Sequence, residues 1–476
     1  MILAYKYKLK PKLSQETIMT NWLDLLRSHY NFCLKDRINA YEQIKYPKLG
    51  NYSDLKTKSE CCPLTCSISN NSGLGEPFKK SGKKRNAYEM QSSELTFLKK
   101  SRPWYKKIYS AVLQQNLRRL DTAFKNFFDG RRYPKFKTRQ RFKSFSYPPR
   151  QIKLKENKIY LPSIGWMRFL KSRNIPDGFN LKSVTVRQKA DGWYVSITIE
   201  NPNIPQSKPL DLNQVKTGIG CDLGIKKLVA LSNGKLIENP QFEKQLSKRK
   251  TLRQRRASRK KRGSSNEKKA YGKLARIDQK IVNQREDYQW KIAHHLTRLA
   301  DVIVLEDLNI QGMIRKCRAK QDENGNFLKN GQSAKKALNR LIRDCSWGNL
   351  KLKIQSIAAK FGSICLEVNP KWTSQKCSHC GHIQKENRNK EHFLCLNCGF
   401  FSDADIQASI NIGLKGIETL RISPSKLLRV TEKVTLKLEA TSSANGREIS
   451  VSSEIEPGNP QQLSLFEWVN GEAIPC

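Results

Sequence analysis

The sequence has no long apolar run and few acidic residues, and both absences limit what the protein can be. No stretch approaches the about 20 consecutive apolar residues that a transmembrane helix needs. The first residues, MILAYKYKLKPKL, lack the apolar core of a secretory signal peptide. We therefore expect a cytoplasmic protein without a membrane partner. The 42 aspartates and glutamates stand against 89 lysines and arginines, which leaves a net charge of +47.

This positive excess opposes compaction unless an anion neutralises it, and nucleic acid is the anion that binds many lysines and arginines through its phosphates. The alternative is a basic protein without a dedicated partner, but such an excess usually lies in a tail. Here residues 431–476 are acidic, with seven acidic and three basic residues, and rich in Ser, Glu and Pro. We predict a disordered tail there and expect the body of the chain to associate with the nucleoid.

The 476 residues suffice for several domains, and their hydrophobic patterns predict an α+β chain. Residues 1–10 alternate as a strand, and residues 182–200 form two alternating runs around Ala-Asp-Gly, as in a β-hairpin. Short apolar runs predict further strands at 218–234, 301–310 and 364–370. Helical spacing predicts helices over 16–44, 105–128, 274–300, 404 onward, and from within 313–345 continuously to about 361.

The segment 47–86 is irregular and we predict an exposed insertion there. Its cysteines, Cys61, Cys62 and Cys66, could hold a metal, but no fourth ligand lies nearby. We favour free surface thiols for these three residues.

Two basic segments are candidate nucleic-acid contacts. Residues 130–150, GRRYPKFKTRQRFKSFSYPPR, interleave cations with rings that could stack on bases or fill a core, the alternative being a solvated loop. Residues 244–262 would form a helix with cations on nearly every face, the alternative being a disordered basic arm. The residues that we assign to nucleic-acid contacts are Arg131, Lys135, Lys137, Arg249, Arg253, Arg256 and Lys260.

Four of the 13 cysteines form two C-x-x-C pairs, Cys377 with Cys380 and Cys395 with Cys398. The intervening residues allow a short hairpin, so that both pairs can reach one ion. Four thiolates close a tetrahedral Zn²⁺ shell without an open position, so we predict a structural zinc site. In a reducing compartment this spacing favours metal over disulfides.

Three acids lie at the ends of apolar strands or at the start of a helix: Asp222 in GCDLGIKK, Glu306 in VLEDLN and Asp405 in SDADIQAS. Each alone is weak evidence, because such acids are usually turn formers or caps. Together, three carboxylates distant in sequence could meet beside a sheet and hold two Mg²⁺ ions about 3.5–4 Å apart. One ion would activate water and the other would stabilise the leaving oxygen of a phosphodiester.

These segments resemble the TnpB family, the RNA-guided nucleases of bacterial insertion sequences, which are kin to compact type V CRISPR effectors. The resemblance extends over about residues 1–415. Its matching pieces are GIGCDLGIKK (218–227), VLEDLN (304–309), PKWTSQKCSHCG (370–381), FLCLNCG (393–399), DADIQASINI (403–412) and, in the N-terminal half, LQQNLRRLDTAFKNFF followed by YPKFK.

The resemblance implies a multidomain α+β protein with an N-terminal β-barrel (wedge), an inserted helical recognition lobe and an RNase H-like RuvC domain that contains a zinc ribbon. The implied boundaries are residues 1–10 and 130–205 for the wedge, 11–129 for the lobe, 206–371 for RuvC, 372–402 for the ribbon and 403–425 for the last RuvC helix. It maps the RuvC acids to Asp222, Glu306 and Asp405. The ribbon would anchor the loop that carries Asp405 opposite the other two acids.

Two positions depart from the family pattern, which often has Arg directly before the third acid and Asn two residues after it. Here these positions hold Ala404 and Gln407, which leaves the cleavage rate open. Asp403 is a second candidate for the third acid, but the small-residue helix QASINI favours Asp405. Arg388, inside the ribbon, is either a surface residue or a contact to the scissile phosphate.

The sequence thus predicts an RNA-guided DNA endonuclease, favoured as a monomer, with guide RNA and double-stranded target DNA as partners. Base pairing would read the target, and the protein would read duplex shape and a short adjacent motif. Three alternatives stay open: a CRISPR effector that uses a separately encoded crRNA, a guided DNA-binding repressor that does not cut, and a transposase that joins strands.

Overall fold

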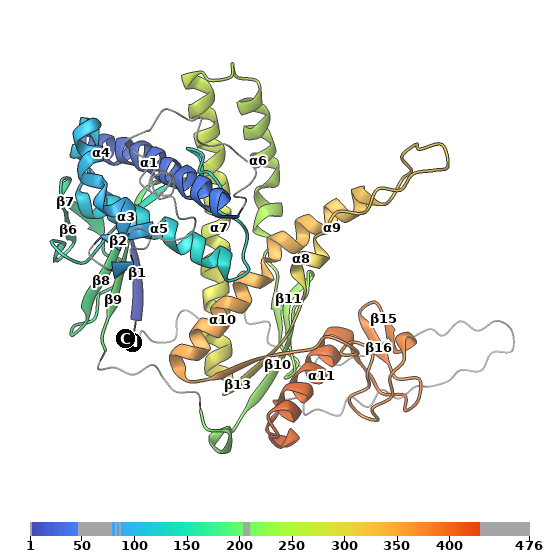
Figure 1. The fold of residues 1–476 in the computed structure, drawn as a ribbon. Coiled ribbons are helices and arrows are strands. Elements are labelled where there is room, and N and C mark those ends of the chain that lie inside the picture. Colours follow the sequence, from blue (N-terminus) through green and yellow to red (C-terminus); the bar gives the residue numbers. More distant parts are fainter. Residues whose placement is uncertain (1, 46–78, 81–82, 85–86, 203–209, 429–476) are drawn as a thin grey trace, which may run out of the picture. The chain divides into compact units, whose positions relative to one another are not determined.

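The computed structural model describes residues 2–45, 79–80, 83–84, 87–202 and 210–428, which fall into two compact units (Figure 1). The first unit contains Met1–Pro205 and Lys261–Gln279, and the second contains Gln206–Lys260 and Lys280–Cys476. Residues 261–279 thus group with the first unit, although we predicted them to lie in the RuvC domain, within 206–371. The predicted acidic tail and Cys61, Cys62 and Cys66 lie outside the described residues.

An antiparallel seven-stranded sheet organises the first unit, in the order β4-β8-β9-β1-β7-β6-β5. The predicted hairpin is present as β8 and β9, and β1 pairs with β9 on one side and with β7 on the other. In the described part of the chain no ladder joins the edge strands β4 and β5, so closure into a barrel stays a prediction. The strands are β1 (Ile2–Lys10), β4 (Ser144–Tyr147), β5 (Lys153–Lys155), β6 (Lys158–Leu161), β7 (Gly165–Leu170), β8 (Asn180–Lys189) and β9 (Gly192–Glu200).

Helices cover the apolar face of this sheet because both elements carry a matching stripe. In β9 every second residue is buried, from Trp193 to Ile199, and α1 buries Trp22, Leu26 and Tyr30 at helical spacing. These side chains belong to one hydrophobic cluster. The remaining elements of this unit are α1 (Leu13–Lys45), α3 (Ala87–Ser93), α4 (Leu95–Ser101), a 3₁₀ turn (Pro103–Lys107), α5 (Ser110–Phe128) and a short β2–β3 hairpin (Lys79–Lys80, Lys83–Lys84).

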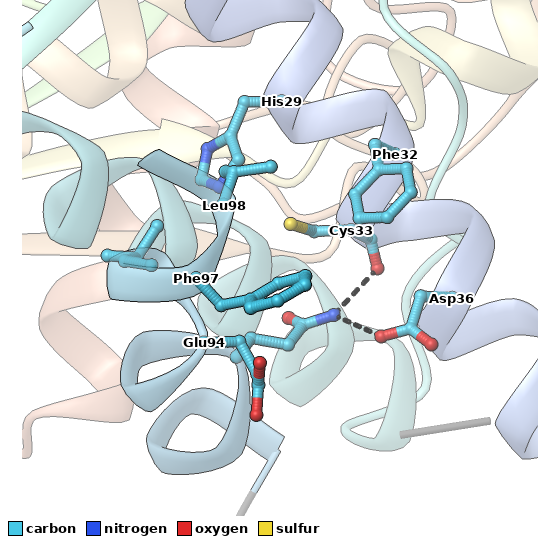
Figure 2. A pocket seen from close by; sticks show the side chains of 9 residues that line it. His29, Phe32, Cys33, Asp36, Glu94, Phe97 and Leu98 are labelled. Atoms are coloured by element: carbon cyan, nitrogen blue, oxygen red, sulfur yellow. Dashed lines mark hydrogen bonds between the residues drawn. The ribbon is translucent and has the colours of Figure 1, made fainter. Parts of the chain in front are cut away.

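A small pocket lies between α1, α3 and α4, and Figure 2 shows the side chains that line it. The Gln91 amide donates to the Cys33 carbonyl at 3.1 Å and to Asp36 Oδ2 at 2.8 Å. Burial lowers the pKa of His29, on the same wall, to about 4, so this histidine is neutral near pH 7. The cavity has a volume of about 20 Å³, which is room for about one water molecule and far too little for a nucleotide.

The second unit is built on a mixed five-stranded sheet in the order β12-β11-β10-β13-β14. The first three of these strands are antiparallel neighbours, whereas β13 runs parallel to β10 and β14 runs parallel to β13. Their bounds are β10 (Gly218–Asp222), β11 (Lys227–Leu231), β12 (Leu236–Glu238), β13 (Val302–Glu306) and β14 (Ile364–Val368).

Both faces of this sheet are covered, which explains the uninterrupted apolar run of β13. Ile303 and Leu305 pack with α7 and α10, whereas Val302 and Val304 pack on the opposite face with α11. The helices are α6 (Phe242–Ser258), α7 (Ser265–Leu299, which begins in the first unit), α8 (Ile310–Met313), α9 (Gln332–Cys345), α10 (Trp347–Phe361) and α11 (Ala404–Thr419). None of the described helices is both long enough and apolar enough to cross a membrane.

Glycines allow α11 to lie against β10 at backbone distance. A Cβ on Gly220 would stand 1.9 Å from the Ser409 carbonyl oxygen and 2.5 Å from the Gly413 nitrogen. A Cβ on Gly416 would stand 2.4 Å from the Val304 side chain. Since real Cβ atoms do not approach other atoms so closely, these positions require glycine, and they fix the helix that begins with Ala404 onto the central strands.

Several predicted helix bounds are wrong, among them the start of the helix predicted from residue 274, which begins at Ser265. The single helix predicted to reach residue 361 is two helices, because Ser346 has a left-handed backbone (φ 54°) between α9 and α10. The basic helix predicted over 244–262 ends at Ser258, and the helix predicted from 105 begins at Ser110 after a 3₁₀ turn that contains Pro103.

Candidate functional site

Two of the three predicted acids end neighbouring parallel strands. Asp222 is the last residue of β10 and Glu306 is the last residue of β13, and the register pairs Cys221 with Leu305. Because parallel strands end at the same edge of a sheet, the two carboxylates lie beside each other. Glu306 is buried, whereas its neighbour Asp307 is exposed and pairs with Lys351.

The third acid, Asp405, reaches this edge from the first turn of α11, the helix that packs on β10. The negative charges of Glu306 and Asp405 both raise the pKa of Asp222, after burial as the larger cause, to about 7. Burial also raises the pKa of Glu306, although a hydrogen bond from Thr373 opposes this shift. The structure therefore brings the three predicted acids into one cluster whose negative charge calls for cations.

Asp403, the other candidate for the third acid, is the N-cap of α11. Its carboxylate caps α11 by accepting hydrogen bonds from the backbone N–H groups of Asp405 at 2.9 Å and Ile406 at 3.0 Å. Asp405 instead directs its carboxylate to Arg388, with 2.8 Å between Arg388 Nη2 and Asp405 Oδ1. Arg388 is thus part of the acidic cluster rather than an isolated surface residue.

The ribbon also contacts the loop that follows the first acid. Arg388 lies in β15 (Arg388–Asn389), which pairs with β16 (His392–Leu394), and β16 pairs with β17 (Phe401–Asp403). At the turn between β15 and β16, Glu391 forms an ion pair with Lys226 of the β10–β11 loop. Figure 1 shows β15 and β16 close to α11, and contacts between α11 and both β16 and β17 agree with this view.

The four predicted cysteine ligands lie close enough together to hold one metal ion. Their Sγ atoms all lie within 4.8 Å of one another, with 3.7 Å between Cys377 and Cys398 and 3.5 Å between Cys380 and Cys395. A tetrahedron with Zn–S bonds of about 2.3 Å separates its sulfurs by about 3.8 Å, whereas a disulfide bond is about 2.05 Å. The spacing therefore fits a metal and excludes a disulfide.

The two C-x-x-C turns are built alike. Each cysteine-pair turn is closed by a glycine with positive φ: Gly381 (79°) donates its N–H to the Cys377 carbonyl, and Gly399 (70°) donates to the Cys395 carbonyl. Ala404 lies fully buried in one apolar cluster with Phe393, Cys377 and Cys395. The position where the family often has Arg thus belongs here to the core of the ribbon.

Sequence reasoning missed Thr373, and it named Gln407 only as a departure from the family pattern. Thr373 donates a hydrogen bond to Glu306, and Gln407 bonds both Ser378 and the Lys376 carbonyl. Both Thr373 and Gln407 lie within segments quoted for the family resemblance. The only available signal was a polar residue among buried neighbours, and a single sequence does not reveal burial at a turn.

The predicted nucleic-acid contacts lie in both units. On α6, Arg249 and Arg256 are exposed and Arg253 is half-buried, and Lys260 is exposed beyond the end of the helix. Residues 130–150 are a loop followed by β4, and contact of this loop with nucleic acid stays a prediction.

Within that loop Arg131 and Lys135 are exposed. Lys137 is more enclosed, since its Nζ lies 5.8 Å from the centroid of the Tyr30 ring and its backbone N–H bonds Asn31. Phe142, Phe145 and Tyr147 fill the core, as one of the two predicted uses has it, whereas Phe136 is 52% exposed and its stacking on bases stays a prediction.

Comparison with known proteins gives three matching family models. Residues 196–317 match a family described as "Probable transposase", and residues 347–412 match "Cas12f1-like, TNB domain". Residues 1–45 match a family described as "Helix-turn-helix domain", although the structure forms one strand and one long helix there. The first two matches include Asp222, Glu306, Asp405 and the four cysteines.

The chain is also similar to curated proteins. It is 34% identical to InsQ of Escherichia coli (strain K12), named as an RNA-guided DNA endonuclease, over 65% of this chain and 75% of InsQ. A protein of the same descriptive name from Streptomyces pristinaespiralis is 32% identical over 70% of this chain and 79% of that protein.

More distant relatives include a CRISPR-associated endodeoxyribonuclease, Cas12f1 of Sulfoacidibacillus thermotolerans, which is 28% identical over 48% of this chain and 51% of its own length. Among solved structures, a Cas12f1–sgRNA–target DNA complex aligns with 87% of this chain and 98% of that chain, at 13% identity and a TM-score of 0.46. This last similarity is too weak to carry an argument.

Proposed function

Because the chain belongs to the TnpB-like family of RNA-guided DNA endonucleases, we propose that Asp222, Glu306 and Asp405 form the active site that hydrolyses target DNA. The observation that carries this proposal is the convergence of these three carboxylates, from β10, β13 and α11, at one sheet edge. The mixed sheet with carboxylates at the ends of its parallel strands supports an RNase H-like RuvC domain in the second unit.

The same reasoning extends to the other predicted domains. Residues 1–10 and 130–205 would be the wedge, and residues 11–129 would be the recognition lobe. The antiparallel sheet of the first unit supports the wedge, and α1, α3, α4 and α5 support the lobe. Residues 372–402 would be the ribbon, and residues 403–425 would complete the RuvC domain.

The acidic cluster fits Mg²⁺ because its donors are carboxylate oxygens, the hard ligands that this ion prefers. The raised pKa of Asp222 supports the same conclusion, since mutual repulsion and burial leave the cluster short of positive charge. Two Mg²⁺ ions would supply an activated water molecule and stabilisation of the leaving oxygen. Cys377, Cys380, Cys395 and Cys398 would hold one structural Zn²⁺.

The chain itself would position the reacting groups. Asp222 and Glu306 are fixed by the ends of two central strands, and Asp405 is fixed by the close packing of α11 on β10. Arg388, which pairs with Asp405 in the structure, would contact a scissile phosphate when DNA is bound, where its planar guanidinium would bind two oxygens. Attack by water would leave a 5′-phosphate and a 3′-hydroxyl.

The partners would be a guide RNA and double-stranded target DNA, in the bacterial nucleoid. The net charge of +47 and the exposed arginines of α6 favour binding along a phosphate backbone. We propose that Arg249, Arg253, Arg256 and Lys260 line the nucleic-acid channel of the second unit. Arg131, Lys135 and Lys137 would serve the first unit in the same way, and the active species would be a monomer.

The test uses protein expressed together with its native flanking DNA. The co-purified RNA is sequenced, and the complex is mixed with Mg²⁺ and a plasmid library that carries the matching target and randomised flanks. Cleavage next to one motif that is abolished by Asp222→Asn supports the proposal. Cleavage that persists in Asp222→Asn contradicts the assignment of the active site.

Guided binding without cleavage is the second function to be tested, because Ala404 and Gln407 depart from the family pattern. Retention of all three acids argues against it, since a protein that only binds has no use for them. Discrete bound RNA with target binding, but without cutting, would favour this function. Ala404→Arg and Gln407→Asn would then be the first variants to assay for restored cleavage.

A further inference from the structure

Thr373 lies between the sheet and the ribbon, in the turn that follows β14. Thr373 is 3% exposed, although the preceding Trp372 is 46% exposed and has a left-handed backbone (φ 69°). A buried hydroxyl in a turn needs a polar partner, because leaving it without one is unfavourable. The partners of Thr373 therefore show what this turn is built for.

The hydroxyl of Thr373 has two acceptors within reach. Its Oγ1 lies 2.6 Å from Glu306 Oε1 and 2.9 Å from the Pro370 carbonyl oxygen. A hydroxyl carries one proton, so the two acceptors share it, and the shorter contact to a carboxylate takes the larger part. The bond uses one oxygen of Glu306 and restricts the rotation of the whole carboxylate.

The backbone of the same turn is bonded to the helix that carries the third acid. Asn411 Nδ2 donates to the Thr373 carbonyl at 2.8 Å and to the Lys376 carbonyl at 2.6 Å, and Gln407 Nε2 donates to the Lys376 carbonyl at 3.0 Å. Gln407 and Asn411 lie one turn apart on α11 and are both buried. The side-chain amides of Gln407 and Asn411 thus fix the backbone of residues 373–376 by hydrogen bonds. Thr373 in turn fixes the Glu306 carboxylate by its hydroxyl.

We propose that Thr373 is a positioning residue that orients the Glu306 carboxylate for divalent metal binding. Gln407 and Asn411 would fix the position of this carboxylate relative to Asp405, because they bond the turn that carries Thr373 to the helix that carries Asp405. The proposal rests on the active site proposed above. Groups that orient metal ligands by hydrogen bonding contribute about 10–100-fold to metal affinity or activity, although they do not touch the metal. Gln407 thereby acquires a role that does not require the asparagine common in the family.

The test compares Thr373→Val, which removes the hydroxyl at nearly constant shape, with Thr373→Ser, which keeps the hydroxyl. Two quantities are measured on the full-length protein. The first is the Mg²⁺ concentration for half-maximal cleavage by the complex with guide RNA, and the second is Mn²⁺ binding to the RNA-free protein, followed by the EPR signal of free Mn²⁺. We expect Thr373→Val to raise both midpoints about 10-fold or more and Thr373→Ser to stay within about twofold of the wild type.

Equal midpoints for Thr373→Val and the wild type would overturn the proposal, as would an equal loss in Thr373→Ser, because packing rather than the hydroxyl would then be responsible. Asp222→Asn separates this failure from failure of the site itself. If Asp222→Asn binds Mn²⁺ like the wild type, the three-acid metal site is wrong. If Asp222→Asn loses binding while Thr373→Val keeps it, only the role of Thr373 is wrong.

A second pair of variants tests the coupling of the Thr373 turn to α11 if Thr373→Val does not fold. Gln407→Met removes the amide that donates to the Lys376 carbonyl, whereas Ser378→Ala removes only the bond to Gln407 Oε1 on the ribbon side. We expect Gln407→Met to raise the Mg²⁺ midpoint about threefold to tenfold and Ser378→Ala to leave it unchanged. An unchanged midpoint in Gln407→Met would overturn the proposed coupling to α11.

Discussion

The cysteine cluster and the acidic cluster lie in the same unit, but they are assembled in different ways. The four cysteines fall between residues 377 and 398, whereas the three acids are spread from residue 222 to residue 405. The thiols lie at distances that suit one tetrahedral ion. The carboxylates come from two strands and one helix, and burial together with the negative charges of Glu306 and Asp405 raises the pKa of Asp222 to about 7.

This difference separates a local site from a distributed one. Two tight turns and their glycines suffice to build the cysteine cluster, so it can form wherever those turns form. The acidic cluster exists only when β10, β13 and α11 are packed together. It also retains unbalanced negative charge, as expected of a site that is completed by metal and substrate.

The largest expected effect is the loss of the cleavage rate when an acid of the acidic cluster is replaced. Asp222→Asn should lower the rate of target cleavage about 10³-fold or more, because members of one catalytic set act as a unit. Guide RNA and target binding should be nearly unchanged. Rates are measured with saturating target and Mg²⁺, and Asp307→Asn, an exposed acid next to Glu306, is the matched control with an expected effect below about twofold. A comparable loss in the control would contradict the assignment of Glu306.

The second largest effect should follow disruption of the cysteine cluster. Cys395→Ser should abolish stoichiometric zinc and lower cleavage about 10–100-fold, since the ribbon orients Asp405 through Arg388 and the cap of α11. The zinc content is measured by elemental analysis, and the folding of the ribbon is measured by its resistance to limited proteolysis. Cys317→Ser removes a thiol outside the cluster and should retain both zinc and activity. Full activity of zinc-free Cys395→Ser would show that the acids do not depend on the ribbon.

A smaller effect should appear in the stability of the metal-free protein. Burial and two neighbouring acids raise the pKa of Asp222 to about 7, so the native state holds this proton more tightly than the unfolded state does. Its contribution to stability therefore falls as the pH rises from about 4 through 7. Between pH 5 and pH 8 the wild type should lose about 2–3 kcal/mol relative to Asp222→Asn. Denaturant unfolding in EDTA-free, metal-depleted buffer measures this, and parallel pH profiles would contradict it.

The smallest effect concerns the first unit and should have the opposite sign. Burial lowers the pKa of His29 to about 4. Between pH 6.5 and 4, His29 is therefore protonated in the unfolded state but stays neutral in the native state. Acidification from pH 7 to pH 5 should therefore remove about 2 kcal/mol of stability. His29→Gln keeps an acceptor for Asn116, which lies 3.1 Å from His29 Nδ1, and should remove this dependence. An unaltered pH profile in the variant would contradict it.

The contrast between the clusters also explains what could be predicted from the sequence. The cysteine ligands were predictable because their spacing is local. Asp222 and Glu306 were predictable as strand ends, since the apolar runs of β10 and β13 are visible as patterns, and Asp405 was predictable as the start of a helix. The pairing of Arg388 with Asp405 and the bond from Thr373 to Glu306 depend on the packing of distant segments, which no pattern in one chain encodes. The break at Ser346 was missed because its left-handed backbone is formed by serine instead of glycine.

The contact between Gly220 and Gly413 also has a consequence for evolution and engineering. Because a single added carbon at Gly220 would collide with the backbone of α11, the separation of Asp222 and Asp405 cannot be adjusted in small mutational steps. Variation that alters this spacing would have to displace the whole helix. Searches for improved variants are therefore better directed to exposed residues of α6 than to the glycines beneath the third acid.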